Sequence, residues 1–432
     1  MTTRLYNFNP GPAALPLEVL EQAKETTVQY GGRGISIMEM SHRSKPVERL
    51  VEETEQLLLE LAGLPQNDYR ALFMGGGAST QFAMLPLNFL SDGKGADYIL
   101  SGSFSEKALQ EAQYIGQTRI AANSQAEQWR RTPDVSSLSI QPNAAYVHMT
   151  TNNTIEGSRF NTFPNTGDVP LIADMTSDLL SRDIDYSRFS MIYAGAQKNL
   201  GPAGITAVII RRKMLDHCSK QIPLIWRYAT YASNDSLYNT PPVHALYLTN
   251  LVLQWTKTQG GVQQLETVNR DKAALIYDVI DRSEGFYEGI IAKNDRSDMN
   301  ITWRLASKEL EQLFVQESEQ QGFEGLAGHR SVGGIRRITL FRAQLARRLL
   351  NSWLTFSGER GDPPIRTPEL GNVPAGRAVS QGQPLPNPQG QPLEFTETTS
   401  SKPSGYNPTQ TLPFKGEGSK GHLPSGLPEG LV

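Results

Sequence analysis

The sequence predicts an α/β protein with a mainly parallel central sheet and flanking helices. Segments typical of a strand, a loop and a helix follow one another between residues 72 and 210, a pattern that favours a parallel sheet. Polar and glycine-rich residues come directly after several of these predicted strands, where ligands gather in such sheets. With 432 residues, the chain is also long enough for a second, smaller domain.

Composition excludes several classes of protein. The net charge is -3 and 20% of the residues are charged, so no basic field favours a nucleic-acid partner. The single cysteine, Cys218, forms no intrachain disulfide, which fits a reducing compartment. Because no apolar run is long enough for a signal peptide or a membrane span, we expect a cytoplasmic protein.

One lysine lies at the centre of the chain's most distinctive stretch. Lys198 is surrounded by small residues in the segment 194–204, on a loop between the predicted strands 190–193 and 205–210. A lysine held in such a core has a lowered pKa and becomes a nucleophile that bonds to aldehydes. An ordinary solvated lysine is the alternative.

A carboxylate stands at the end of the preceding predicted strand. This strand spans residues 169–174 and ends in Asp174, about 24 residues before Lys198. Pyridoxal phosphate needs both groups, a lysine to hold its aldehyde and an acid to keep its ring nitrogen protonated. Alternatively, Asp174 caps a helix or closes a turn.

A glycine-rich turn follows an earlier predicted strand. Residues 72–74 lead into Gly75, Gly76 and Gly77, and a helix is predicted over 81–89. The backbone N–H groups and the dipole at such a helix start favour a phosphate. The signal is weak alone, because the lysine of a P-loop is missing.

Five motifs together resemble the phosphoserine aminotransferases, a family of class V, fold type I enzymes that use pyridoxal phosphate. The resemblance covers about residues 7–336 and implies a large cofactor domain and a smaller α+β C-terminal domain. It lies in Asp174 and in the segments 41–44, 194–204, 239–242 and 328–336.

The resemblance implies roles for individual residues. Lys198 and Asp174 would be catalytic. The family usually has a tryptophan where Phe104 stands, so Phe104 either stacks on the cofactor ring with a smaller face or is simply a core residue. Asn239 and Thr240 would reach the cofactor of the other subunit, which implies a homodimer. The cofactor contacts would be Ala78, Ser79, Phe104, Thr154, Asp174, Gln197, Lys198, Asn239 and Thr240.

The same resemblance implies the substrates and a cationic site for them. L-glutamate would donate an amino group to 3-phosphooxypyruvate, giving O-phospho-L-serine and 2-oxoglutarate in serine biosynthesis, and the chain would also act on 4-phosphohydroxythreonine in pyridoxine biosynthesis. No metal is expected. Taken alone, the arginine of the 41–44 segment is more often an ordinary solvated residue. The substrate-binding residues would be His42, Arg43, His329, Arg330 and Arg336.

We expect four regions along the chain. These are an N-terminal arm and helix (1–30), a large cofactor domain (31–260), a small C-terminal domain altered after residue 336 (261–360), and a disordered tail rich in glycine and proline (361–432). The abrupt change after Arg336 suggests the hypothesis of a frameshift, which the other reading frames of the gene would test.

Two other functions stay open at this stage. A different class V enzyme, such as a cysteine desulfurase, needs a reactive cysteine on a mobile loop, whereas Cys218 falls in a predicted helix over 213–220. A catalytically impaired protein that still binds the cofactor would result if the altered C-terminal part disturbed the small domain.

Overall fold

The computed structural model describes residues 4–90, 93–328 and 334–338, with the backbone alone for 336–338. The predicted tail, and the loop with His329 and Arg330, lie outside these residues. No helix among the described residues is long and apolar enough to cross a membrane.

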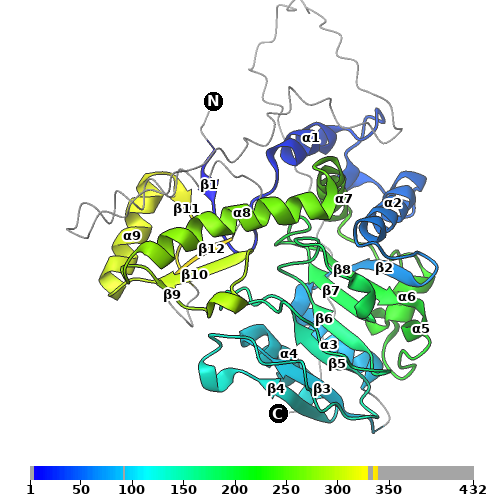
Figure 1. Ribbon diagram of the computed structural model, residues 1–432. Coiled ribbons are helices and arrows are strands. Elements are labelled where there is room, and N and C mark those ends of the chain that lie inside the picture. Colours follow the sequence, from blue (N-terminus) through cyan, green and yellow to red (C-terminus); the bar gives the residue numbers. More distant parts are fainter. Residues whose placement is uncertain (1–3, 91–92, 329–333, 339–432) are drawn as a thin grey trace, which may run out of the picture. The chain divides into compact units, whose positions relative to one another are not determined.

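A mainly parallel sheet of seven strands forms the centre of the chain (Figure 1). β8 runs antiparallel to both of its neighbours, and the other adjacent pairs are parallel. This confirms the predicted α/β class. In spatial order the strands are β2 (Tyr69–Met74), β8 (Thr206–Arg211), β7 (Met191–Gly195), β6 (Leu171–Asp174), β5 (Val147–Thr150), β3 (Ala96–Leu100) and β4 (Thr118–Asn123).

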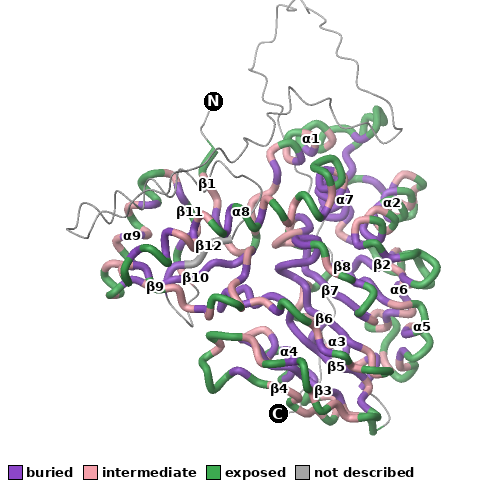
Figure 2. The backbone as a smooth tube through the Cα atoms, viewed as in Figure 1, coloured by how far each residue is buried: buried purple, intermediate pink, exposed green. Residues whose placement is uncertain are grey.

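Helices cover both faces of this sheet because its strands are apolar on both sides. Successive residues alternate between the two faces, so that Ile209 packs with one group of helices and Val208 with the other. Figure 2 shows the central strands as buried. One face carries α1 (Leu17–Val28), α2 (Lys45–Leu61) and α7 (Val243–Thr258), and the other carries α3 (Gly77–Phe89), α4 (Ser103–Gln113) and α6 (Tyr228–Ser233).

A separate hydrophobic core lies in the C-terminal part of the described chain. Trp303 and Ile301 pack there against Ile276 and Phe314, together with Phe8 from the N-terminal arm. The arm is held by parallel pairing of β1 with β11. The elements of this part are β1 (Tyr6–Asn7), α8 (Gly261–Arg282), β9 (Glu288–Gly289), β10 (Asn300–Arg304), α9 (Lys308–Gln320), β11 (Phe323–Glu324) and β12 (Ile335–Ile338).

Two predicted helix boundaries were wrong. α3 begins at Gly77 instead of residue 81, because Gly76 adopts a left-handed φ of 101° that a side chain would disfavour; a Cβ there would also lie 2.1 Å from Thr80 Oγ1. α5 (Arg212–Leu215) ends before Cys218, which is buried beyond it. The short connecting helices are η1 (Ile37–Glu39), η2 (Gln125–Glu127), η3 (Tyr186–Arg188), η4 (Leu224–Trp226) and η5 (Lys293–Asp295).

Candidate active site

A pocket of about 230 Å³ lies at the carboxyl end of the parallel strands. Each residue of its wall comes from the end of β2, β3, β5, β6 or β7 or from the segment that follows it, so the parallel topology gathers them. The wall consists of Gly76, Gly77, Ala78, Ser79, Phe104, Thr150, Asn152, Thr154, Asp174, Thr176, Ser177, Gln197 and Lys198.

Lys198 projects from the loop after β7 and is half-buried. Its Nζ lies 2.5 Å from Thr154 Oγ1 and 4.8 Å from the centre of the Phe104 ring. These contacts come from the segments after β5 and β3, so three strand ends converge on one amine. The amine is therefore held in place at the pocket wall.

Asp174 is the buried acid of the pocket. Thr176 donates two hydrogen bonds to its Oδ1, from Oγ1 at 2.6 Å and from the backbone N at 2.9 Å. Burial raises the pKa of Asp174, while the bonds from Thr176 and the charge of Lys198 oppose that rise. The positive charge of a ligand would favour the ionised carboxylate in the same way.

The start of α3 forms a further part of the wall. Ala78 and Ser79 lie in the first turn of this helix, where backbone N–H groups have no partner within the helix. Together with the helix dipole, they suit an anion such as a phosphate group. The sequence predicted this arrangement although it placed the helix start too late.

The donor set fits pyridoxal phosphate. An amine for the aldehyde, a buried carboxylate for the ring nitrogen, an aromatic face and a helix start for the phosphate all line one cavity. Gln197 also lies in the wall, and its carbonyl accepts a hydrogen bond from the N–H of Ala13 at 2.8 Å. The N-terminal arm therefore contacts the pocket loop.

Several predicted site residues are not brought into this wall. His42 and Arg43 lie between η1 and α2, and Nε2 of His42 is buried without a hydrogen-bond partner among the described residues. Asn239 and Thr240 are exposed. Arg336 is placed by its backbone in β12, whose register sets it opposite Thr302 of β10.

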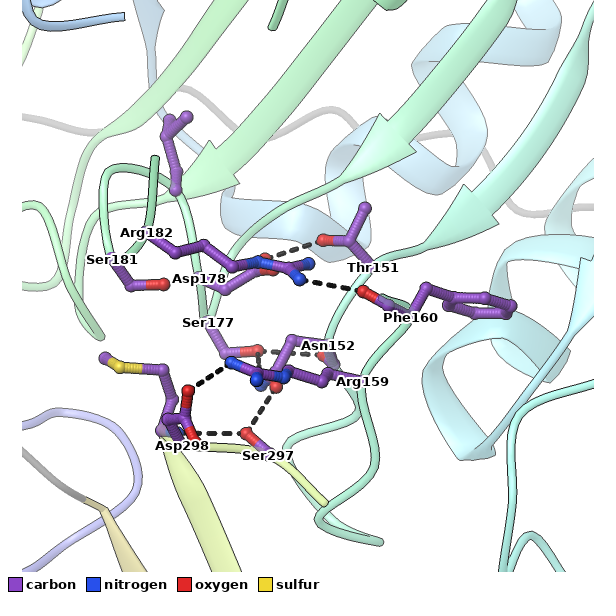
Figure 3. A network of polar contacts seen from close by, with 12 residues as sticks. Thr151, Asn152, Arg159, Phe160, Ser177, Asp178, Ser181, Arg182, Ser297 and Asp298 are labelled. Carbon is purple, nitrogen blue, oxygen red and sulfur yellow. Dashed lines mark hydrogen bonds and ion pairs between the residues drawn. The ribbon is translucent and has the colours of Figure 1, made fainter. Parts of the chain in front are cut away.

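Four wall residues that sequence reasoning missed are Thr150, Asn152, Thr176 and Ser177. The Asn152 side chain donates to Ser177 Oγ at 2.8 Å and accepts from Ser297 Oγ at 2.5 Å (Figure 3). It also donates to Asn300 Oδ1 at 2.7 Å. These bonds connect the ends of β5 and β6 with the start of β10. Their position directly after predicted strands was a usable signal, but their partners were not visible in the sequence.

A buried ion pair supports the same region (Figure 3). Asp178 accepts from Thr151 Oγ1 at 2.6 Å and from the Arg182 guanidinium at 3.1 Å, and Arg182 also donates to the carbonyl of Phe160. Arg159 and Asp298 form a second pair nearby. The loop after Asp174 is thus fixed by charged hydrogen bonds.

Fold and pocket together define a class of enzyme, and comparison with known proteins agrees. Residues 5–344 match the profile of the family described as aminotransferase class-V, and the chain belongs to this family. The match begins about two residues before the region of resemblance and ends about eight residues after it.

Among its relatives are proteins named phosphoserine aminotransferase. The one from Niallia circulans is 54% identical over 336 residues, which are 78% of this chain and 92% of the relative. The structure of phosphoserine aminotransferase from Bacillus circulans subsp. alkalophilus superposes with a TM-score of 0.82 at 51% identity, covering 83% of this chain and 100% of that one. The pyridoxal-phosphate-bound enzyme from Trichomonas vaginalis gives a TM-score of 0.74 at 32% identity, covering 81% and 99%.

Proposed function

We propose that this chain is a phosphoserine aminotransferase that depends on pyridoxal phosphate. It transfers the amino group of L-glutamate to 3-phosphooxypyruvate, giving O-phospho-L-serine and 2-oxoglutarate. The observation that carries this proposal is the convergence of Lys198, Asp174 and the α3 start on one pocket in a chain about half identical to enzymes of that name.

Each wall residue has a task in this proposal. When bound, pyridoxal phosphate supplies an aldehyde for the amino group and a ring that takes up electrons. Lys198 Nζ would hold the aldehyde, and its amine would carry the proton that amino transfer removes from the substrate Cα. Asp174 keeps the ring nitrogen charged, and Thr154 orients Lys198 Nζ.

The remaining contacts bind and orient the cofactor. Ala78, Ser79 and Gln197 would hold its phosphate at the start of α3, and Phe104 would supply an aromatic face for its ring. A phenylalanine offers a smaller face than the tryptophan usual in the family, so we expect weaker stacking on the ring and a lower affinity for the cofactor.

We propose that five cationic or dual-function residues bind the substrate anions: His42, Arg43, His329, Arg330 and Arg336. A substrate with a carboxylate and a phosphate needs several donors at once, and guanidinium groups grip such anions with paired hydrogen bonds. In support, β12 pairs with β10 through Arg336 and Thr302, and Thr302 hydrogen-bonds the loop that carries Thr154. The same site would accept 4-phosphohydroxythreonine, which has the same two anionic groups.

We further propose a cytoplasmic homodimer in which Asn239 and Thr240 contact the cofactor phosphate of the partner. Both residues are exposed and lie outside the wall of the pocket. Exposed apolar side chains occur near them at Tyr238 and elsewhere at Met38 and Val28. The domain boundaries at residues 30, 260 and 360 belong to the same proposal.

The test begins with titration of the purified protein with pyridoxal phosphate. We expect a visible absorption band and amino transfer from glutamate to 3-phosphooxypyruvate, both lost in Lys198→Ala. Lys257→Ala, which removes an exposed lysine paired with Glu60, is the matched control and should keep both. Colour without turnover would support the impaired cofactor-binding protein, and no colour would contradict cofactor binding altogether.

Mixing of inactive variants tests the dimer. Lys198→Ala and Asn239→Ala should each be inactive alone. If the two residues act across the interface, a mixed dimer has one site with both defects and one site with neither, so activity should return on mixing. A protein that sediments as a monomer at all concentrations would contradict the proposal, and so would a mixture of the two variants that regains no activity.

A further inference from the structure

Glu156 is a buried carboxylate close to the pocket but outside its wall. Its side chain is 6% exposed, and it lies two residues after Thr154 on the loop that follows β5. Oε1 accepts hydrogen bonds from the backbone N and the Oγ of Ser103, at 2.8 and 2.7 Å. Oε2 is buried and accepts none from the described residues. Burying a carboxylate oxygen without a partner costs stability, so this side chain is a candidate for a functional role.

The contact with Ser103 joins the Thr154 loop to the start of α4. Ser103 is the first residue of this eleven-residue helix and Phe104 is the second. A carboxylate is favoured at this end by the helix dipole. Gly102 leaves the space for it, since a Cβ there would lie 2.6 Å from Oε2. Glu156 therefore fixes the helix end that carries Phe104.

The same loop is held from its other side by the C-terminal part of the chain. The Glu156 carbonyl accepts from Thr302 Oγ1 of β10 at 2.6 Å, and the carbonyl of Gly157 accepts from the N–H of Ser297 at 2.9 Å. A Cβ at Gly157 would lie 2.7 Å from Thr302 Oγ1, so the approach is close. The backbone of residue 156 thus cannot shift without moving both the loop and β10.

Thr154 and Phe104 both contact Lys198 Nζ, and they stand on the two segments that Glu156 connects. We infer that Glu156 is a positioning residue, which sets Thr154 and the Phe104 ring on either side of the Lys198 amine. This inference rests on the proposed function. A carboxylate that only caps α4 would contribute stability and leave the environment of the amine unchanged.

The test compares variants of the holoenzyme by the visible absorption of cofactor bound at Lys198. In Glu156→Ala we expect about tenfold weaker affinity for pyridoxal phosphate, because hydrogen bonds to a charged group are lost. We also expect the pH midpoint of the visible band to move by roughly half a unit or more, because Thr154 and Phe104 shift against the amine. Glu156→Gln keeps an oxygen for Ser103 and should restore most of both properties.

Ser103→Ala gives a milder version should Glu156→Ala fail to fold. It removes the hydroxyl donor and leaves the backbone N–H, so about a threefold loss of affinity is expected. Ser187→Ala is its matched control, since Ser187 donates the same kind of bond to Asp185 in η3, away from the pocket. The affinity of Ser187→Ala for pyridoxal phosphate and the pH midpoint of its visible band should equal those of the unmodified chain.

Two results would overturn the inference. One is a Glu156→Ala protein with lower thermal stability but unchanged cofactor affinity and pH midpoint. The other is a Glu156→Gln protein as defective as Glu156→Ala, since the hydrogen bonds to Ser103 would then not be the cause. Failure of the unmodified chain to bind pyridoxal phosphate would instead contradict the proposed function, so the two failures are distinguishable.

Discussion

Replacement of Arg182 by methionine tests how the loop after Asp174 is held. Arg182 and Asp178 form a buried ion pair, with side chains 8% and 3% exposed. In Arg182→Met, Asp178 keeps one side-chain donor among the described residues, Thr151 Oγ1 at 2.6 Å. The carbonyl of Phe160 loses its bond from the guanidinium. The substitution therefore leaves a nearly uncompensated charge inside the protein.

The expected cost follows from this burial. Removing one partner of a buried pair lowers the free energy of unfolding by about 3–5 kcal/mol, whereas an exposed pair contributes about 1 kcal/mol or less. Lys257 and Glu60 are such an exposed pair, at 55% and 57%. Lys257→Met should therefore change stability far less than Arg182→Met.

Urea unfolding monitored by tryptophan fluorescence gives the comparison. The double variant with Arg182→Met and Asp178→Asn removes both charges while leaving an oxygen for Thr151, so it should recover most of the loss. A single variant within about 1 kcal/mol of the unmodified chain would refute the reasoning. A double variant as unstable as the single one would refute it equally.

The same substitution should change the pH dependence of catalysis. The charge of Asp178 already raises the pKa of Asp174, and without Arg182 that charge is less compensated. A higher pKa leaves a smaller ionised fraction of Asp174 at a given pH. The acid limb of the rate profile should therefore move to higher pH in Arg182→Met; a shift to lower pH, or none, would contradict this coupling.

Three further outcomes are expected. Because burial raises the pKa of Asp174, its ionised form destabilises the cofactor-free protein. Asp174→Asn should therefore be more stable than the unmodified chain at neutral pH, and this difference should disappear in acid. Amino transfer should be lost in the same variant. Burial lowers the pKa of His148 to about 3, and its Nε2 lies 2.7 Å from Tyr193 Oη. Between pH 6.5 and 3 the unfolded chain binds one proton more than the folded chain, so the free energy of unfolding should fall by about 1.4 kcal/mol for each unit by which the pH is lowered. This component should be missing in the double variant with His148→Phe and Tyr193→Phe. Burial raises the pKa of Cys218 to about 11, so a thiol reagent at pH 8 should react with it only after unfolding. Cys218→Ser should keep amino transfer. Rapid labelling of the native protein would favour cysteine chemistry instead.

Much of the fold and part of the site could be predicted because their signals are local. Apolar runs mark strands, glycine marks the turn before α3, and a parallel sheet brings the ends of its strands to one edge. This rule put Lys198 and Asp174 at neighbouring strand ends, and both line the pocket. The late prediction of the α3 start shows the limit, because the apolar pattern does not reveal the left-handed conformation of Gly76 after which the helix begins.

Taken by itself, the sequence determined the α/β class, the strand ends that carry the chemistry and the family resemblance. Only the tertiary structure decided which side chains support that chemistry, because their bonds join distant segments. Lys198 meets Thr154 across 44 residues, Glu156 meets Ser103 across 53, and Asn152 meets Asn300 across 148. Hydrogen bonds of this kind require angstrom-scale positions that packing sets, and no local pattern encodes them.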